Sequence, residues 1–150
     1  MAKKQSINKL SSALENYLEA IAKLKRENKY ARISTIAKSL KVKNSSANAA
    51  VKFLAANGLV NHERYGYIDL TASGERVAAE IQRKHDALYK FLKEVLFVES
   101  GAALSEACEI EHVVSGETVR RLEKLYFFIK NKYLKTPADI KTLKKYFEKP

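Results

Sequence analysis

The sequence predicts a mainly α-helical protein with one short β-hairpin near its middle. Helix breakers are scarce among the 150 residues, with Gly 5 and Pro 2, while the hydrophobic share of 46% is enough for a core. Apolar residues recur at the helical spacing of three to four along most of the chain. Only residues 59–70 change to a strand-like pattern around a glycine-bearing turn, so we expect three helices, a hairpin and four further helices.

The first half predicts a winged helix-turn-helix unit. Two short helices joined by a tight turn at 41–44 are typical of a helix-turn-helix, and a hairpin directly after them adds the wing. In chain order, the expected elements are a helix from Ser11–Ser12 to about Asn28, an extended piece over Tyr30–Ile33, a helix capped by Ser34, a helix from Asn44 or Ser45 to Asn57–Gly58, and strands on either side of Arg64-Tyr65-Gly66.

The second half predicts an all-helical body. Its expected elements are a long helix capped by Thr71 from about Ala72 to Val98, a break at Ser100-Gly101, a helix over Ala102–Val114, a helix capped by Ser115, and a last helix from Thr136-Pro137 to about Phe147. We therefore expect a winged-helix domain at 1–72, a helical domain at 73–135 and a C-terminal helix with a basic tail at 136–150.

The net charge of +11 is unevenly distributed. Residues 1–60 carry twelve basic and three acidic side chains (+9), residues 61–122 eight and eleven (−3), and residues 123–150 eight and three (+5). A basic first part indicates a polyanionic partner, and an acidic middle indicates a cationic one. Charge alone leaves DNA, RNA and lipid open, as well as a simply solvated lysine-rich surface.

The compartment predicted from composition is the cytoplasm. The single cysteine cannot form an internal disulfide, and the first residues lack the apolar core of a secretion signal. The longest uncharged apolar runs fall short of a membrane span. We expect no membrane partner and no small-molecule substrate.

In a winged helix the third helix enters the major groove of DNA. Its face opposite the apolar stripe is small and polar, which permits close approach, an adenine contact from the amide and phosphate attraction from the lysines. The candidate DNA-binding residues are Lys43, Ser45, Ser46, Asn48, Ala49 and Lys52, with Arg64 and Tyr65 at the wing tip. The helix face has no arginine, so backbone and shape recognition should dominate. The alternative is a solvated helix with capping serines.

A thiol, a carboxylate and an imidazole share one helical face at Cys108, Glu111 and His112, because these positions are one turn apart. His85 on the long helix is a further candidate ligand. Glu19, with Asn16 one turn earlier, is another on the first helix. Taken singly, a lone cysteine is usually a small buried hydrophobe, and such a histidine or carboxylate is usually satisfied by its neighbours. Together, these thiol, carboxylate and imidazole side chains predict a transition-metal site.

These residues carry a resemblance to the diphtheria-toxin-repressor and manganese-transport-regulator family of bacterial repressors, from about Leu10 to Tyr126. The matching strings are Glu15–Ile21, Arg83–His85 and Cys108–Ser115, followed by Arg120-Arg121-Leu122. The resemblance implies a homodimer that binds metal between helices and then represses transcription from a palindromic DNA operator. It also implies that Cys108, Glu111 and His112 are regulatory-site ligands, with Glu19 as the first-helix carboxylate and His85 as a shared histidine.

The departures from the family are informative. Asn16 stands where the family uses Asp or Met, while Tyr89 and Leu104 replace ligands of the second site of the iron regulators. One well-built site is therefore expected, in a short form without the small C-terminal barrel. Cysteine at position 108 is the iron-regulator variant, and thiolate with imidazole suits Fe(II), Zn(II), Co(II) or Ni(II). We expect Fe(II) first and Mn(II) second, with Zn(II), Co(II) or Ni(II) binding in vitro.

The predicted function is a metal-dependent, dimeric repressor that controls metal homeostasis. Two alternatives are a metal-independent winged-helix regulator with a structural Cys/Glu/His cluster, and a metal-buffering protein with an incidental basic head. No general base or nucleophile constellation accompanies the ligands, so no enzyme is expected. The dimer is expected from the apolar surplus of Leu88, Phe91, Leu92, Leu96, Leu125, Phe127 and Phe128.

Overall fold

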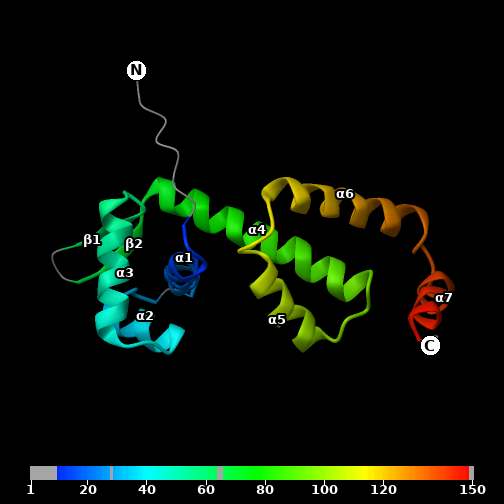
Figure 1. Ribbon diagram of the computed structural model, residues 1–150, viewed down its shortest axis with the longest axis horizontal. Coiled ribbons are helices and arrows are strands. Elements are labelled where there is room, and N and C mark those ends of the chain that lie inside the picture. The colour runs from blue at the N-terminus through cyan, green and yellow to red at the C-terminus, as the bar shows by residue number, and fades with distance from the viewer. Residues whose placement is uncertain (1–9, 28, 64–65, 149–150) are drawn as a thin grey trace, which may run out of the picture. The chain divides into compact units, whose positions relative to one another are not determined.

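The computed structural model describes residues 10–27, 29–63 and 66–148. These residues form helices and one two-stranded antiparallel sheet in the predicted order (Figure 1). The chain divides into two compact units, Met1–Gln82 and Arg83–Pro150. The elements are α1 (Ser12–Arg26), α2 (Ile33–Leu40), α3 (Asn44–Ala56), β1 (Val60–His62), β2 (Ile68–Leu70), α4 (Ala72–Glu94), α5 (Ser100–Ile110), α6 (Gly116–Lys132) and α7 (Pro137–Phe147).

The core of the first unit is the apolar side of three helices closed by the sheet. Its fully buried members come from each of these elements: Leu18 and Ile21 of α1, Ile36 of α2, Val51 and Leu54 of α3, and Leu59 before β1. Burying each such side chain stabilises the folded state by about 1.5–3 kcal/mol. The periodic apolar stripe of each helix therefore faces a common interior and leaves the opposite side of α3 exposed.

Two tight turns fix the direction of α3. Before it, Lys41 adopts a left-handed conformation (φ 54°), and the Val42 N–H donates to the Ala37 carbonyl at 3.0 Å. After it, Gly58 has φ 69°, and the Leu59 N–H donates to the Leu54 carbonyl at 2.9 Å. This second turn is the glycine stop that the Asn57-Gly58 pair predicted. Helices α2 and α3, joined by the first turn, form the helix-turn-helix.

The wing is a short hairpin joined to the helices at its base. Val60 pairs with Leu70 and His62 with Ile68. The Ile68 N–H also donates to the Ala31 carbonyl at 2.9 Å, so the segment before α2 lies beside β2. The expected tip residues Arg64 and Tyr65 lie outside the described residues.

The predicted start of α2 was wrong. The helix begins at Ile33, with Arg32 in an extended conformation before it. The Thr35 hydroxyl accepts a hydrogen bond from the Arg32 N–H at 2.8 Å, which fixes the first turn. Ser34 therefore lies inside the helix and is not its cap.

The predicted end of α4 and start of α5 were also wrong. Helix α4 ends at Glu94, and Phe97 adopts a left-handed conformation (φ 56°) with its ring edge-on to Phe147. Helix α5 begins at Ser100, because the Glu99 carboxylate accepts hydrogen bonds from the N–H groups of Gly101 and Ala102. Ser100-Gly101 is thus a helical first turn, and α5 ends at Ile110 rather than at Val114.

In the second unit, polar contacts connect the middle and the end of α4 to α6. Arg83 and Glu123 form an ion pair at 2.6 Å, and the Tyr126 hydroxyl donates to the Glu94 carboxylate at 2.7 Å. Burial and this carboxylate raise the pKa of Tyr126 to about 12. The small buried residues Ala103 and Ala107 give α5 a flat inner side. None of the described helices has the length and apolar content to cross a membrane.

Gly74, in the first turn of α4, provides a test of the packing in the first unit. A Cβ there would overlap the backbone carbonyl oxygen of Leu59, which also accepts a hydrogen bond from the Thr71 N–H at 3.0 Å. We expect Gly74→Ala to lower the free energy of unfolding by about 1–3 kcal/mol, measured by urea denaturation followed by circular dichroism. Gly101→Ala is the matched control, because the nearest atom there belongs to the Glu99 side chain. Unchanged stability of Gly74→Ala would contradict this packing.

Candidate metal centre

The C-terminal end of α5 brings three potential ligands together. Cys108 lies in the last turn of the helix, Glu111 follows its last residue and His112 comes next. The Glu111 N–H still donates to the Ala107 carbonyl at 3.0 Å, so the helical path continues as far as Glu111. One ligand atom from each of Cys108, Glu111 and His112 lies within 4.8 Å of the other two. Their one-turn spacing thus places them on a common side even though the helix is shorter than predicted.

A fourth candidate, His85, reaches this cluster from α4. Its Nδ1 lies 2.7 Å from Oε2 of Glu111, while Nε2 of His112 lies 3.6 Å from Oε1 of the same carboxylate. Glu111 therefore lies between two imidazoles. It is 1% exposed and is the only charged residue that is buried in the described part of the chain. Because a buried carboxylate is costly unless charges or hydrogen bonds compensate it, this position calls for cationic partners.

The donor set fits a transition-metal ion. A thiolate, a carboxylate and imidazoles are ligands of Fe(II), Co(II), Ni(II) and Zn(II), which bind such atoms at about 2.0–2.3 Å. The three ligand atoms lie within 4.8 Å of one another, close enough for one ion to lie among them. A dication held by Cys108, Glu111, His112 and His85 would offset the buried charge of Glu111 and connect α4 to the end of α5.

Asn16 and Glu19 belong to the other compact unit. Both lie on α1 and are half-buried. Their participation in the site stays a prediction. Tyr89 and Leu104 are the residues that the resemblance places at second-site positions. The Tyr89 hydroxyl accepts a hydrogen bond from Lys93 at 3.0 Å, and the apolar side chain of Leu104 is exposed.

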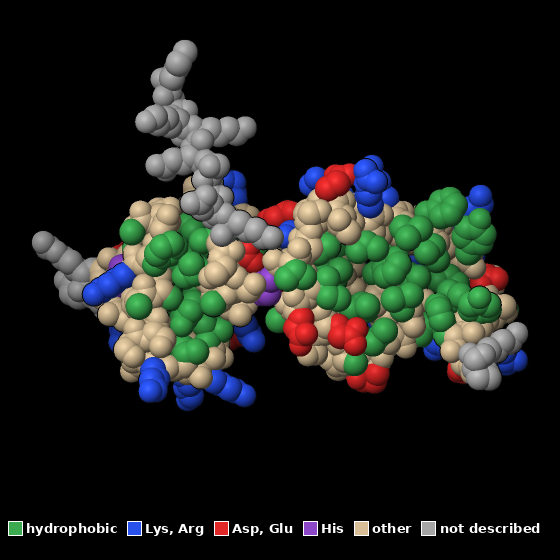
Figure 2. Space-filling view, viewed as in Figure 1, with side chains coloured by type: hydrophobic (Ala, Val, Ile, Leu, Met, Phe, Trp, Pro, Cys, Tyr) green, Lys and Arg blue, Asp and Glu red, His purple; other side chains and the backbone are tan. Residues whose placement is uncertain are grey.

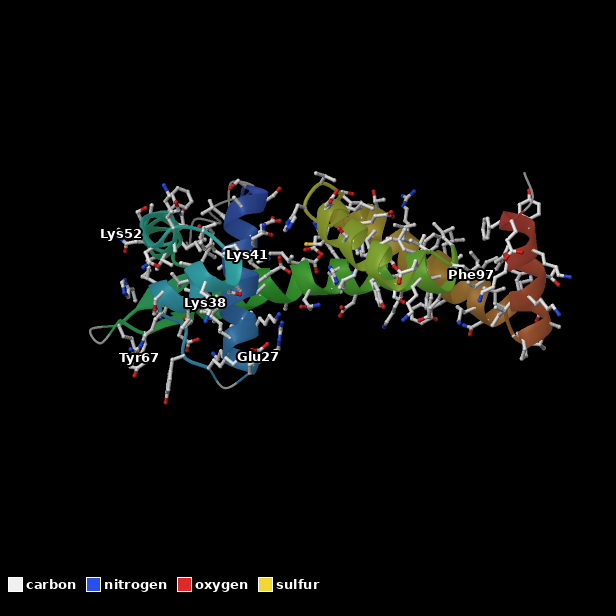
Figure 3. The ribbon with its side chains drawn as sticks, turned by 90° about the horizontal axis from the view of Figure 1, so that it is seen from below. Glu27, Lys38, Lys41, Lys52, Tyr67 and Phe97 are labelled. Carbon is white, nitrogen blue, oxygen red and sulfur yellow. The ribbon has the colours of Figure 1, made fainter. Side chains whose placement is uncertain are left out.

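Apart from the two wing residues, the candidate DNA-binding residues lie at the N-cap and on the first three turns of α3. Lys43, Ser45, Ser46, Ala49 and Lys52 are exposed, and Asn48 is half-buried. Two further lysines, Lys38 and Lys41, are exposed at the end of α2 and in the turn before α3 (Figure 3). They are not among the residues predicted from the sequence, although lysines cluster at positions 38, 41 and 43.

Comparisons with protein families match most of the chain. Residues 9–68 match the N-terminal DNA-binding domain of iron-dependent repressors, and residues 71–137 match their metal-binding and dimerisation domain. An uncharacterised helix-turn-helix transcriptional regulator, MJ0568 of Methanocaldococcus jannaschii, is 36% identical over 115 residues, covering 76% of this chain and 92% of its own. The regulator MntR of Shouchella clausii is 33% identical over 113 residues, covering 75% and 78%.

Solved structures resemble the fold. The manganese regulator SloR has a TM-score of 0.67 and 29% identity, covering 75% of this chain and 52% of SloR. IdeR of T. acidophilum has a TM-score of 0.67 and 28% identity, covering 75% and 53%. The chain thus spans about half the length of these two proteins.

Cys108 is the only cysteine and its side chain is exposed, so a thiol reagent reports on this one ligand. We expect anaerobic addition of Co(II) or Fe(II) to slow modification of Cys108 by roughly tenfold or more, because a coordinated thiolate is no longer an available nucleophile. The rate of modification is measured from the absorbance of the chromophore that the thiol reagent releases. Glu111→Gln should abolish the protection while Cys108 still reacts without metal. Equal rates with and without metal would remove Cys108 from the ligand set.

Proposed function

Because the chain belongs to the family of iron-dependent repressors, we propose that it is a metal-dependent DNA-binding transcriptional repressor of genes for metal-ion homeostasis. The observation that carries this proposal is the convergence of Cys108, Glu111, His112 and His85. The same chain carries a winged helix whose third helix and its N-cap expose two lysines and small polar residues. The chain thus has candidate residues for metal binding in one unit and for DNA binding in the other.

The proposed metal is Fe(II), with Mn(II) second. The thiol of Cys108 favours a softer ion than an all-oxygen and imidazole set would. Affinity alone does not decide the physiological ion, since zinc and nickel bind such ligands more tightly. We propose Cys108, Glu111, His112 and His85 as ligands, joined by Glu19 and the weaker amide oxygen of Asn16. The bound dication supplies charge that holds these ligands in one arrangement.

The proposed DNA contact is made by α3 in the major groove of a palindromic operator. Ser45, Ser46 and Ala49 allow close approach, Asn48 offers an amide to a base edge, and Lys43 and Lys52 attract phosphates. Arg64 and Tyr65 of the wing are proposed to contact the flanking phosphates or the minor groove.

The proposed dimer buries an apolar surface of the second unit against a second copy of the chain. Leu125, Phe127 and Phe128 of α6 are all exposed, and they lie within the range that matches the dimerisation domain. Hydrophobic side chains gather over this unit in Figure 2. The same unit also has an apolar pocket of about 630 Å³, lined mainly by the end of α4, the end of α6 and α7. Leu88, expected to contribute, is instead 4% exposed and belongs to the protomer's own core.

The function is tested by an anaerobic metal titration read out by operator binding at fixed salt, alongside calorimetry with Fe(II) or Mn(II). We expect wild-type protein to retard promoter DNA of metal-uptake genes only with metal. His112→Ala should lose roughly tenfold or more in metal affinity and most of the metal dependence. Lys52→Ala should bind metal as wild type does but show a salt dependence of DNA affinity that is smaller by about one counterion.

Each alternative gives its own result. Metal-independent retardation with calorimetry that His112→Ala leaves unchanged would identify a winged-helix regulator with a structural cluster. Metal binding without retardation under any condition would identify a metal-buffering protein.

The dimer is tested by sedimentation of metal-loaded protein. We expect Phe127→Asp to weaken self-association roughly tenfold or more, because it places a charge in an apolar interface. Phe53→Asp is the matched control, since Phe53 is a comparably exposed phenylalanine on α3. A monomeric wild type, or equal association of the two variants, would rule out the proposed surface.

A further inference from the structure

A lysine on α4 contacts the backbone that carries two of the proposed metal ligands. The ammonium of Lys84 donates to the Val114 carbonyl at 3.0 Å and lies 3.3 Å from the Glu111 carbonyl. Lys84 is half-buried, although α4 offers many solvent-facing positions. Its side chain thus lies across the turn that leads from α5 to α6.

This turn needs an external donor. The last carbonyl groups of a helix have no N–H partner within the helix, and a cation near them interacts favourably with the helix dipole. Within the turn, the N–H groups of Val113 and Val114 both donate to the Ile110 carbonyl. Lys84 donates to the carbonyls of Glu111 and Val114, so it satisfies the two ends of the segment that contains His112.

Lys84 and His85 are consecutive on α4, and both contact Glu111. Lys84 contacts its backbone carbonyl, while Nδ1 of His85 lies 2.7 Å from its carboxylate. Glu111 is therefore fixed at its main chain and at its side chain by two neighbouring residues. This double contact sets the distance between the ligand on α4 and the ligands after α5.

We propose that Lys84 is a positioning residue for the metal centre: it holds the Glu111–Val114 turn against α4, so that His85, Glu111 and His112 are arranged before an ion binds. The proposal rests on the proposed metal-binding function. Groups that orient metal ligands from outside the coordination shell typically contribute 10- to 100-fold in metal affinity. Lys84 contributes by contact with main-chain atoms, and its test does not depend on DNA binding.

Because Lys84 is positively charged, the direction of the change in metal affinity distinguishes an electrostatic effect from a positioning effect. A cation beside the site repels an incoming dication, so removal of charge alone would tighten metal binding. Loss of the two carbonyl contacts would weaken it. Lys84→Met removes both the charge and the donors, so a positioning role predicts weaker binding and a purely electrostatic effect predicts tighter binding.

The experiment is an anaerobic Co(II) titration of the full chain, followed by the thiolate-to-cobalt charge-transfer band and the ligand-field bands. We expect Lys84→Met to lower Co(II) affinity about 10- to 100-fold and to change the ligand-field spectrum. Lys84→Arg keeps the cation and its donors and should recover part of the affinity. Lys90→Met is the matched control, because Lys90 is an exposed lysine on the same helix. It should behave as wild type.

The outcomes separate this inference from the function on which it rests. No Co(II) binding by wild-type protein would overturn the proposed function itself. Normal wild-type binding with an unchanged or tighter affinity of Lys84→Met would overturn only the role of Lys84. The role of Lys84 would also be overturned if Lys84→Met lowered the stability of the metal-free protein, measured by urea denaturation, but left the cobalt spectrum unaltered. If Lys84→Met does not fold, Lys84→Gln is the substitute, because it keeps N–H donors on a shorter side chain. We expect Lys84→Gln to show an intermediate loss of Co(II) affinity. Wild-type affinity of this variant would overturn the proposal.

Discussion

The buried carboxylate of Glu111 is the constraint around which the second unit is organised. A carboxylate with 1% exposure is tolerated only where hydrogen bonds and positive charge compensate its loss of water. His85 approaches it from α4 and His112 from the following turn. Lys84 holds its main chain. A divalent ion between these groups would complete the compensation, so the electrostatic requirement of one side chain links the helix packing to the proposed chemistry.

Much of the fold follows from local chemistry that the sequence displays openly. Ser11, Ser115 and Thr136 cap helices as expected, because each side chain accepts from an N–H three residues ahead. The predicted helix starts were wrong where other side chains accept these hydrogen bonds. A glutamate side chain starts α5, and a threonine inside α2 accepts from the N–H of Arg32. The left-handed conformation of Phe97 accompanies a packing contact with Phe147, fifty residues away, which no local pattern indicates.

The candidate site, like the fold, was predictable from the sequence only in part. Cys108, Glu111 and His112 could be grouped from spacing alone, because one helical turn relates them. His85 could be proposed only from its chemical type, and its 2.7 Å approach to Glu111 depends on tertiary packing. Lys84 escaped notice because a lysine on a long charged helix is usually a solvated residue. Glu19 and Asn16 lie in the other unit, and their role stays a prediction.

The base of the wing determines where the sequence of this protein is free to vary. The Thr71 hydroxyl donates to the Gly58 carbonyl at 2.7 Å, and the Thr71 N–H donates to the Leu59 carbonyl, against which Gly74 packs. The two ends of the hairpin are thus joined by contacts that do not involve the residues between them. Changes of sequence or length at the tip then cost the fold little, since closing a slightly longer loop adds only a fraction of 1 kcal/mol. Under the proposed function, in which the tip contacts DNA, operator preference can therefore change there without a loss of stability that other mutations must first offset.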